Sequence, residues 1–263
     1  MRMLLVLVLV VGAAAPARAL APPNSAGVTF GHLHINVSDI AAQDKFWAAY
    51  FGGKPFSHGA QRGVRFPDGF LILYTAVAPT APSQGSSLDH FGFKVPNLAA
   101  FLGHWRAGGL TVQNEINGME GTPASNLLGL DGLRIEVQEE PTVPGPTANH
   151  MHFQTTENAG LRDWYVSTFG LQASTRGRLA TAANIPGMNL SFSGTRTPVE
   201  ATRGRAIDHI GFEVNDLAAA VRALEAKGVM IDGPVRNLAG YRAATLVDPQ
   251  GVTVELTQGL ADY

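Results

Sequence analysis

Histidine pairs recur at two distant places in this chain of 263 residues. GHLHINVSDI begins at Gly31 and NHMHFQTTEN begins at Asn149, and each stretch places two histidines one residue apart. Two further stretches, LDHFGF from Leu88 and IDHIGF from Ile207, each carry one histidine in a similar short apolar run. Six of the eight histidines therefore share one repeated pattern. Imidazole binds metals and also exchanges protons near neutral pH, so the pattern indicates either kind of chemistry.

A glutamate completes each set, because LDGLRIEV and VDPQGVTVEL both place a glutamate four residues after a glycine. Taken in chain order, the histidines and glutamates predict two metal-binding triplets, with gaps of 58 and 46 residues in one and 59 and 46 in the other. The triplets are His32, His90 and Glu136, and His150, His209 and Glu255. Two imidazoles and one carboxylate form a facial ligand set that leaves positions open for water or substrate. A closed structural zinc site commonly uses cysteine, and the chain has none, so catalysis is favoured.

The second histidine of each pair, His34 or His152, should face the same cavity as the first, because alternate residues of a strand point the same way. The matching positions in the other two units are Gly92 and Gly211, which would leave room for an extra imidazole. Three roles stay open: a catalytic proton carrier beside the metal, the metal ligand itself with the first histidine in support, or a core histidine that donates to a carbonyl. A His152→Gln variant that keeps its metal but turns over more slowly would support the first role.

Four similar units must position these side chains. Each unit reads as a strand, an amphipathic helix and three further strands, and the units start near Val28, Leu88, Asn149 and Ala206. The proline-rich stretch 139–148 has no periodicity and predicts a linker. We therefore pair units one and two in one half of the chain and units three and four in the other.

The composition indicates a soluble, turn-rich α+β protein. Residues 1–19 combine a basic residue, a short apolar run and small residues, which predicts a signal peptide and a periplasmic or secreted protein. The apolar run is too short to span a bilayer. The net charge of −2 is scattered, so neither nucleic acid nor an anionic membrane is an expected partner. The lack of cysteine excludes disulfides and thiolate chemistry.

The four units, the DHxGF starts at Asp89 and Asp208, and the endings DGLRIEV and DPQGVTVEL resemble the vicinal oxygen chelate superfamily of glyoxalases, type I extradiol dioxygenases and bleomycin-resistance proteins. The resemblance implies an α+β fold of four βαβββ modules that form two tandem, partly closed mixed β-barrels with flanking helices. It also implies that consecutive modules share a barrel with the metal inside. The expected domains are residues 27–138 and 149–259, joined by the linker.

Within that family, glyoxalases take a fourth ligand from a position that corresponds here to Leu73 and Ser191, neither of which is a good ligand. Three ligands per half resemble the extradiol dioxygenases, which implies Fe²⁺ or Mn²⁺, with Zn²⁺, Co²⁺ or Ni²⁺ as alternatives. Those enzymes carry a further histidine and a tyrosine before the final turn. Here NLAGYRAATLVDPQG has no histidine, and Tyr241 is the candidate catalytic tyrosine, with Arg242 beside it.

The sequence thus predicts an exported enzyme that depends on a divalent metal and acts on a small substrate with vicinal oxygens, most like an extradiol-type dioxygenase. A glyoxalase-like isomerase or lyase is the first alternative, and a metal-free binding protein of the bleomycin-resistance type is the second. One half can be active while the other is scaffold, and the resemblance favours the C-terminal set. The expected partner is a small molecule, and a homo-oligomer is compatible with the sequence. His58 and Arg62 are weaker candidates for lining the first site.

Overall fold

The computed structural model describes residues 20–238 and 240–262, so the predicted signal peptide lies outside the described residues. The chain forms four consecutive βαβββ modules, as the sequence predicts. Module 1 comprises β1 (Val28–Asn36), α1 (Ile40–Phe51), β2 (Lys54–His58), β3 (Gln61–Arg65) and β4 (Leu71–Thr75). Module 2 comprises β5 (Leu88–Val95), α2 (Leu98–Ala107), β6 (Thr111–Asn117), β7 (Pro123–Leu128) and β8 (Arg134–Glu139). Module 3 comprises β9 (Thr147–Thr155), α3 (Asn158–Phe169), β10 (Gln172–Arg176), β11 (Leu179–Ile185) and β12 (Met188–Gly194). Module 4 comprises β13 (Ile207–Val214), α4 (Leu217–Ala226), β14 (Arg236–Asn237), β15 (Arg242–Val247) and β16 (Thr253–Gln258).

The modules combine into two eight-stranded mixed sheets. The first sheet has the order β14-β15-β16-β13-β1-β4-β3-β2 and joins modules 4 and 1. The second has the order β10-β11-β12-β9-β5-β8-β7-β6 and joins modules 3 and 2. The α+β class and the module count are confirmed, but the prediction that consecutive modules share a barrel is wrong. Each sheet takes one module from each predicted half, because β1 pairs antiparallel with β13 and β5 with β9.

Side-chain caps fix where three of the helices begin. Asp39, Asn97 and Asp216 each have extended backbone and accept a hydrogen bond from an amide in the first turn of α1, α2 and α4. Such caps satisfy amide groups that have no partner inside a helix. At its other end, α1 stops at Gly52, whose φ of 69° is a left-handed conformation that glycine adopts without a steric penalty. Local sequence therefore sets the ends of these helices before any packing occurs.

The alternation along the central strands divides each sheet into two faces. In β1, Leu33 and Ile35 join the main hydrophobic core, while His32 and His34 lie on the opposite face, which we call the inner face. The core also takes the large side chains of the helices, such as Trp47 and Trp105, which are fully buried. The packed helices and the core thus hold rigid strands whose inner faces carry the histidines.

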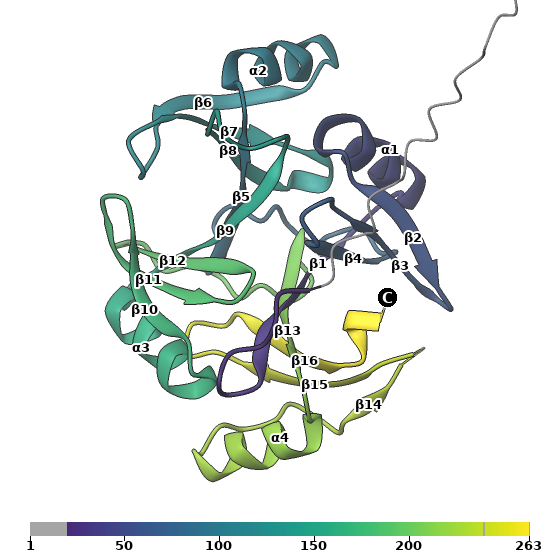
Figure 1. Cartoon of the computed structure of the whole chain (residues 1–263), viewed down its shortest axis with the longest axis vertical. Coiled ribbons are helices and arrows are strands. Elements are labelled where there is room, and N and C mark those ends of the chain that lie inside the picture. Colours follow the sequence, from purple (N-terminus) through teal and green to yellow (C-terminus); the bar gives the residue numbers. More distant parts are fainter. Residues whose placement is uncertain (1–19, 239, 263) are drawn as a thin grey trace, which may run out of the picture.

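Figure 1 shows the four helices at the periphery of the molecule, with the central strands of both sheets between them. The first strand of each module lies beside the first strand of another module, so all the repeated histidine motifs come to the middle of a sheet. Across residues 20–238 and 240–262, none of the helices has the length and apolar character needed to cross a bilayer.

Candidate metal sites

The first candidate, site A, lies on the inner face of the first sheet and takes His32 from β1, His209 from β13 and Glu255 from β16. The Nε2 atoms of His32 and His209 lie 3.4 and 3.8 Å from Oε2 of Glu255. All three atoms are buried and lack a hydrogen-bond partner within the described part of the chain. Two ligand atoms about 2.1 Å from one ion lie about 3.0–3.4 Å apart. Small side-chain shifts would therefore let the three atoms hold one ion.

The second candidate, site B, repeats this arrangement on the second sheet with His150 from β9, His90 from β5 and Glu136 from β8. The Nε2 atom of His90 lies 3.6 Å from Oε2 of Glu136, and Nε2 of His150 lies 3.7 Å from Oε1. Both Nε2 atoms are buried and lack a hydrogen-bond partner among residues 20–238 and 240–262. The distances between the histidine nitrogens and the glutamate oxygens are therefore similar in the two sites.

An aspartate orients one histidine of each site. The Nδ1 atom of His209 lies 2.6 Å from Oδ1 of Asp208, and Nδ1 of His90 lies 2.7 Å from Oδ1 of Asp89. A proton on Nδ1 is donated to the carboxylate, which turns the Nε2 lone pair toward the site and increases its basicity as a ligand. The DHxGF starts contain these aspartates, but no role was predicted for them from the sequence. Their position directly before each histidine, in both copies, was the available signal.

The repeated glycines make room for the first histidine of each pair. Gly211 pairs with His32 across β13 and β1, and Gly92 pairs with His150 across β5 and β9. A Cβ atom on Gly92 would lie 2.2 Å from Cε1 of His150. The prediction that these glycines accommodate the second histidines is therefore wrong. It failed because the antiparallel register places each glycine opposite the first histidine of the pair, while the second histidines, His34 and His152, lie opposite His209 and His90.

The second histidines stack on a ligand histidine instead. The ring of His34 lies 4.3 Å from that of His209, with 22° between the planes. Its Nε2 lies 2.8 Å from the Thr75 hydroxyl, while its Nδ1 is buried without a hydrogen-bond partner in the described chain. His152 likewise stacks on the site B histidine of β5 and contacts the Ser193 hydroxyl through Nε2, at 2.8 Å. Each second histidine is thus a neighbour of its site, and a nitrogen of His34 or His152 lies within 4.8 Å of the nitrogens of the other two histidines, so the ligand role also stays open.

The charges in site A favour one protonated and two neutral histidines when no cation is bound. Burial disfavours the imidazolium of His209, but Asp208 and Glu255 outweigh burial and raise its pKa to about 9. Burial lowers the pKa of His32, although Glu255 opposes the shift. Burial, with the positive charge of His209 next, lowers the pKa of His34 well below its usual range. Burial opposes ionisation of Glu255, but the nearby imidazoles of His209 and His32 hold its pKa well below the usual range.

In site B the pKa values shift in the same directions. Burial opposes the imidazolium of His90, but the carboxylates of Asp89 and Glu136 beside it raise its pKa. Burial lowers the pKa of His150 well below its usual range, and the guanidinium of Arg176 is the next largest cause. In each site, burial thus favours the neutral form of one imidazole, that of His32 or His150, and the carboxylate is ionised, whereas a cation would have to displace a proton from the other imidazole, that of His209 or His90. Site B differs in having a buried cation close by.

Site A opens to the surface through a pocket of about 360 Å³. The pocket is lined by Arg203, Asp208, His209, Asp232, Arg236, Thr245 and Thr253. Arg236 has 48% of its side chain exposed and donates hydrogen bonds to Oε1 of Glu255 and to the Thr245 hydroxyl. The opposite oxygen, Oε2, is the one that faces the histidines. A small polar molecule therefore has a route to His209, past side chains that can make hydrogen bonds.

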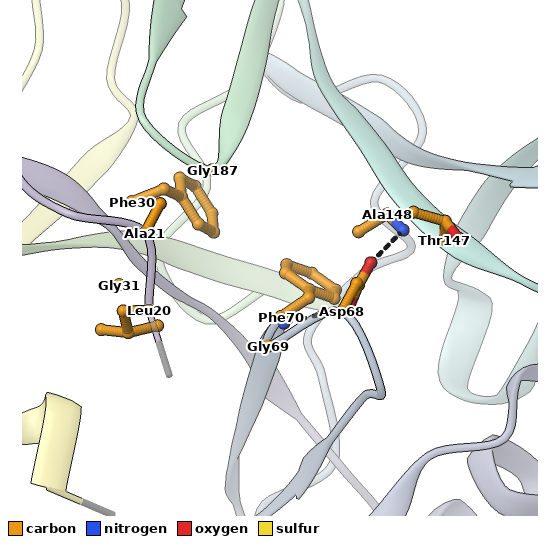
Figure 2. A pocket seen from close by; sticks show the side chains of 10 residues that line it. All are labelled: Leu20, Ala21, Phe30, Gly31, Asp68, Gly69, Phe70, Thr147, Ala148 and Gly187. Atoms are coloured by element: carbon orange, nitrogen blue, oxygen red, sulfur yellow. Dashed lines mark hydrogen bonds between the residues drawn. The ribbon is translucent and has the colours of Figure 1, made fainter. Parts of the chain in front are cut away.

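Another pocket, of about 200 Å³, lies at the seam between the sheets and is shown in Figure 2. Phe30 and Phe70 face each other across it, and Asp68 accepts a hydrogen bond from the amide of Ala148 at its edge. None of its lining residues belongs to site A or site B. It contributes to the packing of the modules and is not a candidate for chemistry.

Residues 87–256, more than half of the chain, match the family described as the Glyoxalase/Bleomycin resistance protein/Dioxygenase superfamily. The chain belongs to this superfamily. Membership agrees with the four modules and with the paired histidine sites, and it confirms the resemblance drawn from the DHxGF and DPQG motifs. No match is found among the curated proteins.

Solved structures of superfamily proteins share the fold across nearly the whole chain. Glyoxalase I from Zea mays is similar with a TM-score of 0.71 and 16% identity, covering 89% of this chain and 94% of its own. A Bacillus subtilis protein named "putative dioxygenase" is similar with a TM-score of 0.67 and 13% identity, covering 88% of this chain and 85% of its own. At these identities the likeness concerns the fold, and the choice of reaction has to come from the site.

Both predicted triplets mix the two sites. The first grouped His32 with His90 and Glu136, which lie on the other sheet. The second grouped His150 with His209 and Glu255, which lie on the first sheet. All six residues face one of the two candidate sites, but the predicted grouping was wrong, and their role as metal ligands stays a prediction. An internal repeat identifies equivalent positions, but it does not determine which module pairs with which.

Other candidates from the sequence make different contacts. Tyr241 packs in a small apolar cluster with Leu73 and donates a long hydrogen bond of 3.5 Å to Oε1 of Gln61, so its catalytic role stays a prediction. Leu73 pairs with His34 on the neighbouring strand. His58 is exposed at the end of β2.

Proposed function

We propose that this protein is a metal-dependent enzyme that acts at site A on a small substrate with two neighbouring oxygen atoms. The main support is the convergence of Nε2 of His32, Nε2 of His209 and Oε2 of Glu255, three buried atoms without hydrogen-bond partners in the described residues. A buried polar atom without a partner costs free energy, and a cation satisfies all three at once. The adjoining pocket supports access from solvent.

The cation we propose is Fe²⁺ or Mn²⁺, with Zn²⁺, Co²⁺ or Ni²⁺ as alternatives. When bound, such an ion polarises the oxygen atoms of a substrate at its open positions and stabilises the negative charge that develops on them. His32, His209 and Glu255 would hold it from one side, which leaves the side facing the pocket for substrate. Asp208 would keep His209 in the tautomer that presents Nε2.

Extradiol-type ring cleavage is our first candidate reaction. Two features support it: the ligand set has three protein members, with Leu73 where a fourth would lie, and His34 supplies an imidazole close to the ligands. The sequence before the final turn has no histidine, so His34 would take the proton from a catechol hydroxyl in its place. The neutral form of His34, which burial favours, is the form able to accept that proton.

A glyoxalase-like isomerase or lyase is the second candidate, and His34 is again the reason. Isomerisation moves a proton between neighbouring carbons, which needs one base within reach of both and no dioxygen. A single imidazole stacked beside the ligands suits that task. The metal-free binding protein is the weakest candidate, because it leaves three buried atoms of site A without partners.

The deciding experiment uses the mature chain loaded anaerobically with Fe²⁺ or Mn²⁺. Oxygen uptake is followed with a panel of catechols, and isomerisation is followed with the hemithioacetal of methylglyoxal and glutathione. Uptake that requires metal and is lost in His209→Ala supports ring cleavage, and isomerisation with the same dependence supports the second candidate. A chain that takes up no metal but binds catechols tightly contradicts the enzyme proposal. Gly103→Ala, in an open helix position, is the matched control.

Export to the periplasm or medium is part of the same proposal and rests on residues 1–19 alone. Intact mass measurement of protein recovered from the periplasm should give a chain shortened near residue 19. A full-length chain found only in the cytoplasm would contradict it.

A further inference from the structure

Arg176 lies inside site B. It is the last residue of β10, and only 4% of its side chain is exposed. Its Nη1 lies 3.5 Å from Oε1 of Glu136, the same oxygen that faces the ligand atom of His150. The guanidinium therefore approaches the carboxylate on the side where the ligands converge.

The guanidinium of Arg176 also contacts Ser191, His152 and Glu120. Nε donates to the hydroxyl of Ser191 at 2.8 Å, and Nη2 lies 3.4 Å from Nδ1 of His152. Nη1 lies 3.7 Å from Glu120 as well as near Glu136. With its Nε2 on a serine hydroxyl and its Nδ1 facing Arg176, His152 has both ring nitrogens engaged. His152 thus differs from His34, whose Nδ1 has no hydrogen-bond partner in the described chain.

The charges of site B are already balanced by arginines. Asp89, which orients His90, is paired with Arg134, and Glu136 faces Arg176. A divalent cation between His90, His150 and Glu136 would add two positive charges beside a guanidinium whose side chain is only 4% exposed. Repulsion between such charges is strong where water cannot screen it.

Site A lacks this feature. The position that corresponds to Arg176 in module 1 is His58, which also ends its hairpin strand but is exposed. Arg236 does contact Glu255, but it approaches from the pocket, contacts the oxygen turned away from the histidines and is half exposed. Arg236 therefore lies half in solvent, whereas Arg176 is enclosed by Ser191, His152 and the two glutamates.

We infer that the guanidinium of Arg176 takes the place of the metal in site B, so that the chain binds one divalent cation, at site A, and keeps site B as a buried ion-pair cluster that joins modules 2 and 3. Ligand spacing is nearly the same in the two sites, so the fixed charge of Arg176 is what separates them. The inference concerns site B and does not depend on the reaction proposed for site A.

The test is a titration of the full mature chain with Co²⁺, followed by its visible absorption and by elemental analysis after desalting. The wild-type chain should bind one equivalent, which His209→Ala should lose and His90→Ala should retain. Arg176→Ala should bind one equivalent more than the wild type, and the double variant Arg176→Ala/His90→Ala should lose that gain. Arg178→Ala, an exposed arginine two residues further on, should bind the same amount as the wild type.

Two equivalents in the wild type, or loss of metal in His90→Ala, would overturn the inference. So would an Arg176→Ala chain with wild-type circular dichroism and no additional cation. If Arg176→Ala does not fold, the stoichiometries of the wild type and of His90→Ala still show whether site B binds a cation. If the wild type binds no Co²⁺ at all, the function proposed for site A fails, whereas a gain of one equivalent in Arg176→Ala would still support the role given to Arg176.

Discussion

Gly211 lies so close to His32 that a Cβ atom at position 211 would come within 1.9 Å of the ring carbon Cε1 of His32. The two residues are paired across β13 and β1, and the imidazole lies over the glycine backbone. The contact is unrelated to glycine's backbone freedom, because Gly211 does not have a positive φ. What site A requires at this position is the absence of a side chain, so that a ligand from another module can reach Glu255.

Gly211→Ala should therefore weaken Co²⁺ binding at site A by about tenfold or more, since the displaced imidazole can no longer point Nε2 at the ion. Calorimetric titration of the folded variant measures this change. Gly103→Ala is the matched control: nothing lies within 4 Å of an added Cβ there, and alanine favours a helix over glycine. Wild-type affinity in Gly211→Ala would contradict the assignment of His32 as a ligand.

Asp208→Asn should lower the affinity of site A for a divalent metal by about 10–100-fold while leaving the ligand set intact. An amide does not hold the Nδ1 proton of His209 as a carboxylate does, so the Nε2 lone pair is less firmly oriented and less basic. Asp89→Asn makes the same change in site B. It should leave the metal affinity of the chain unchanged if site A alone binds the ion, and an equal loss in both variants would contradict that asymmetry.

The metal-free protein should lose stability as the pH rises from about 6.5 to about 9. The pKa of His209 is raised to about 9 in the folded chain, above its usual value, so the folded state binds the proton more tightly than the unfolded state. The stabilisation is complete below about pH 6.5 and disappears above about pH 9, and it amounts to about 3 kcal/mol. Urea unfolding at pH 6 and pH 9.5 measures it.

His209→Gln is the control for that measurement, because it removes the titrating ring. Its unfolding free energy should change less between the two pH values than that of the wild type. An equal change in both proteins would assign the pH dependence to other groups. Since metal binding requires neutral His209, Co²⁺ affinity of the wild type should rise with pH over the same interval.

The sequence predicted the four modules and the six residues that gather in the two candidate sites, whose role as ligands stays a prediction. Strand alternation and caps such as Asp39 are local, so the modules and their limits could be derived from short stretches. The pairing of β1 with β13 could not, because strands 28–36 and 207–214 are far apart and every module offers an equivalent first strand. Sequence repeats contain no information on which equivalent strand is the partner.

The position of Arg176 in site B could not be predicted from the sequence for a related reason. It ends a polar strand, QASTR, that reads as an exposed hairpin edge, and its counterpart in module 1 is an exposed histidine. Its burial against Glu136 follows from the curvature that brings β10 toward β8, and these strands are not neighbours in the sheet. Only the folded structure shows that a buried guanidinium, that of Arg176, lies in site B.

His34→Gln should retain one equivalent of metal and lower turnover by about 10²–10⁴-fold, the contribution typical of a positioned acid or base. The amide still contacts the Thr75 hydroxyl but cannot exchange a proton. His152→Gln should have little effect on turnover, because both ring nitrogens of His152 are engaged in site B. Loss of metal from His34→Gln would make His34 a ligand and leave the proton carrier to be found elsewhere.

Tyr165→Phe should lower the free energy of unfolding by about 1–2 kcal/mol without changing metal stoichiometry. The hydroxyl of Tyr165, in α3 of module 3, donates to Oδ2 of Asp248 at 2.9 Å, and both groups are buried. Asp248 also accepts backbone amides of the turn that precedes β16, the strand that carries Glu255. Burial raises the pKa of Asp248 to about 6, and the Tyr165 bond opposes that shift.

A double-mutant cycle with Asp248→Asn isolates this bond from the packing of the ring. The bond links module 3 to module 4, and so one sheet to the other. Its loss should therefore lower the urea concentration at the midpoint of the cooperative unfolding transition of the whole chain. Additive effects of the two substitutions would show that the carboxylate finds another donor. A coupling energy of about 1 kcal/mol or more would show that the hydrogen bond between Tyr165 and Asp248 stabilises the contact between the two sheets.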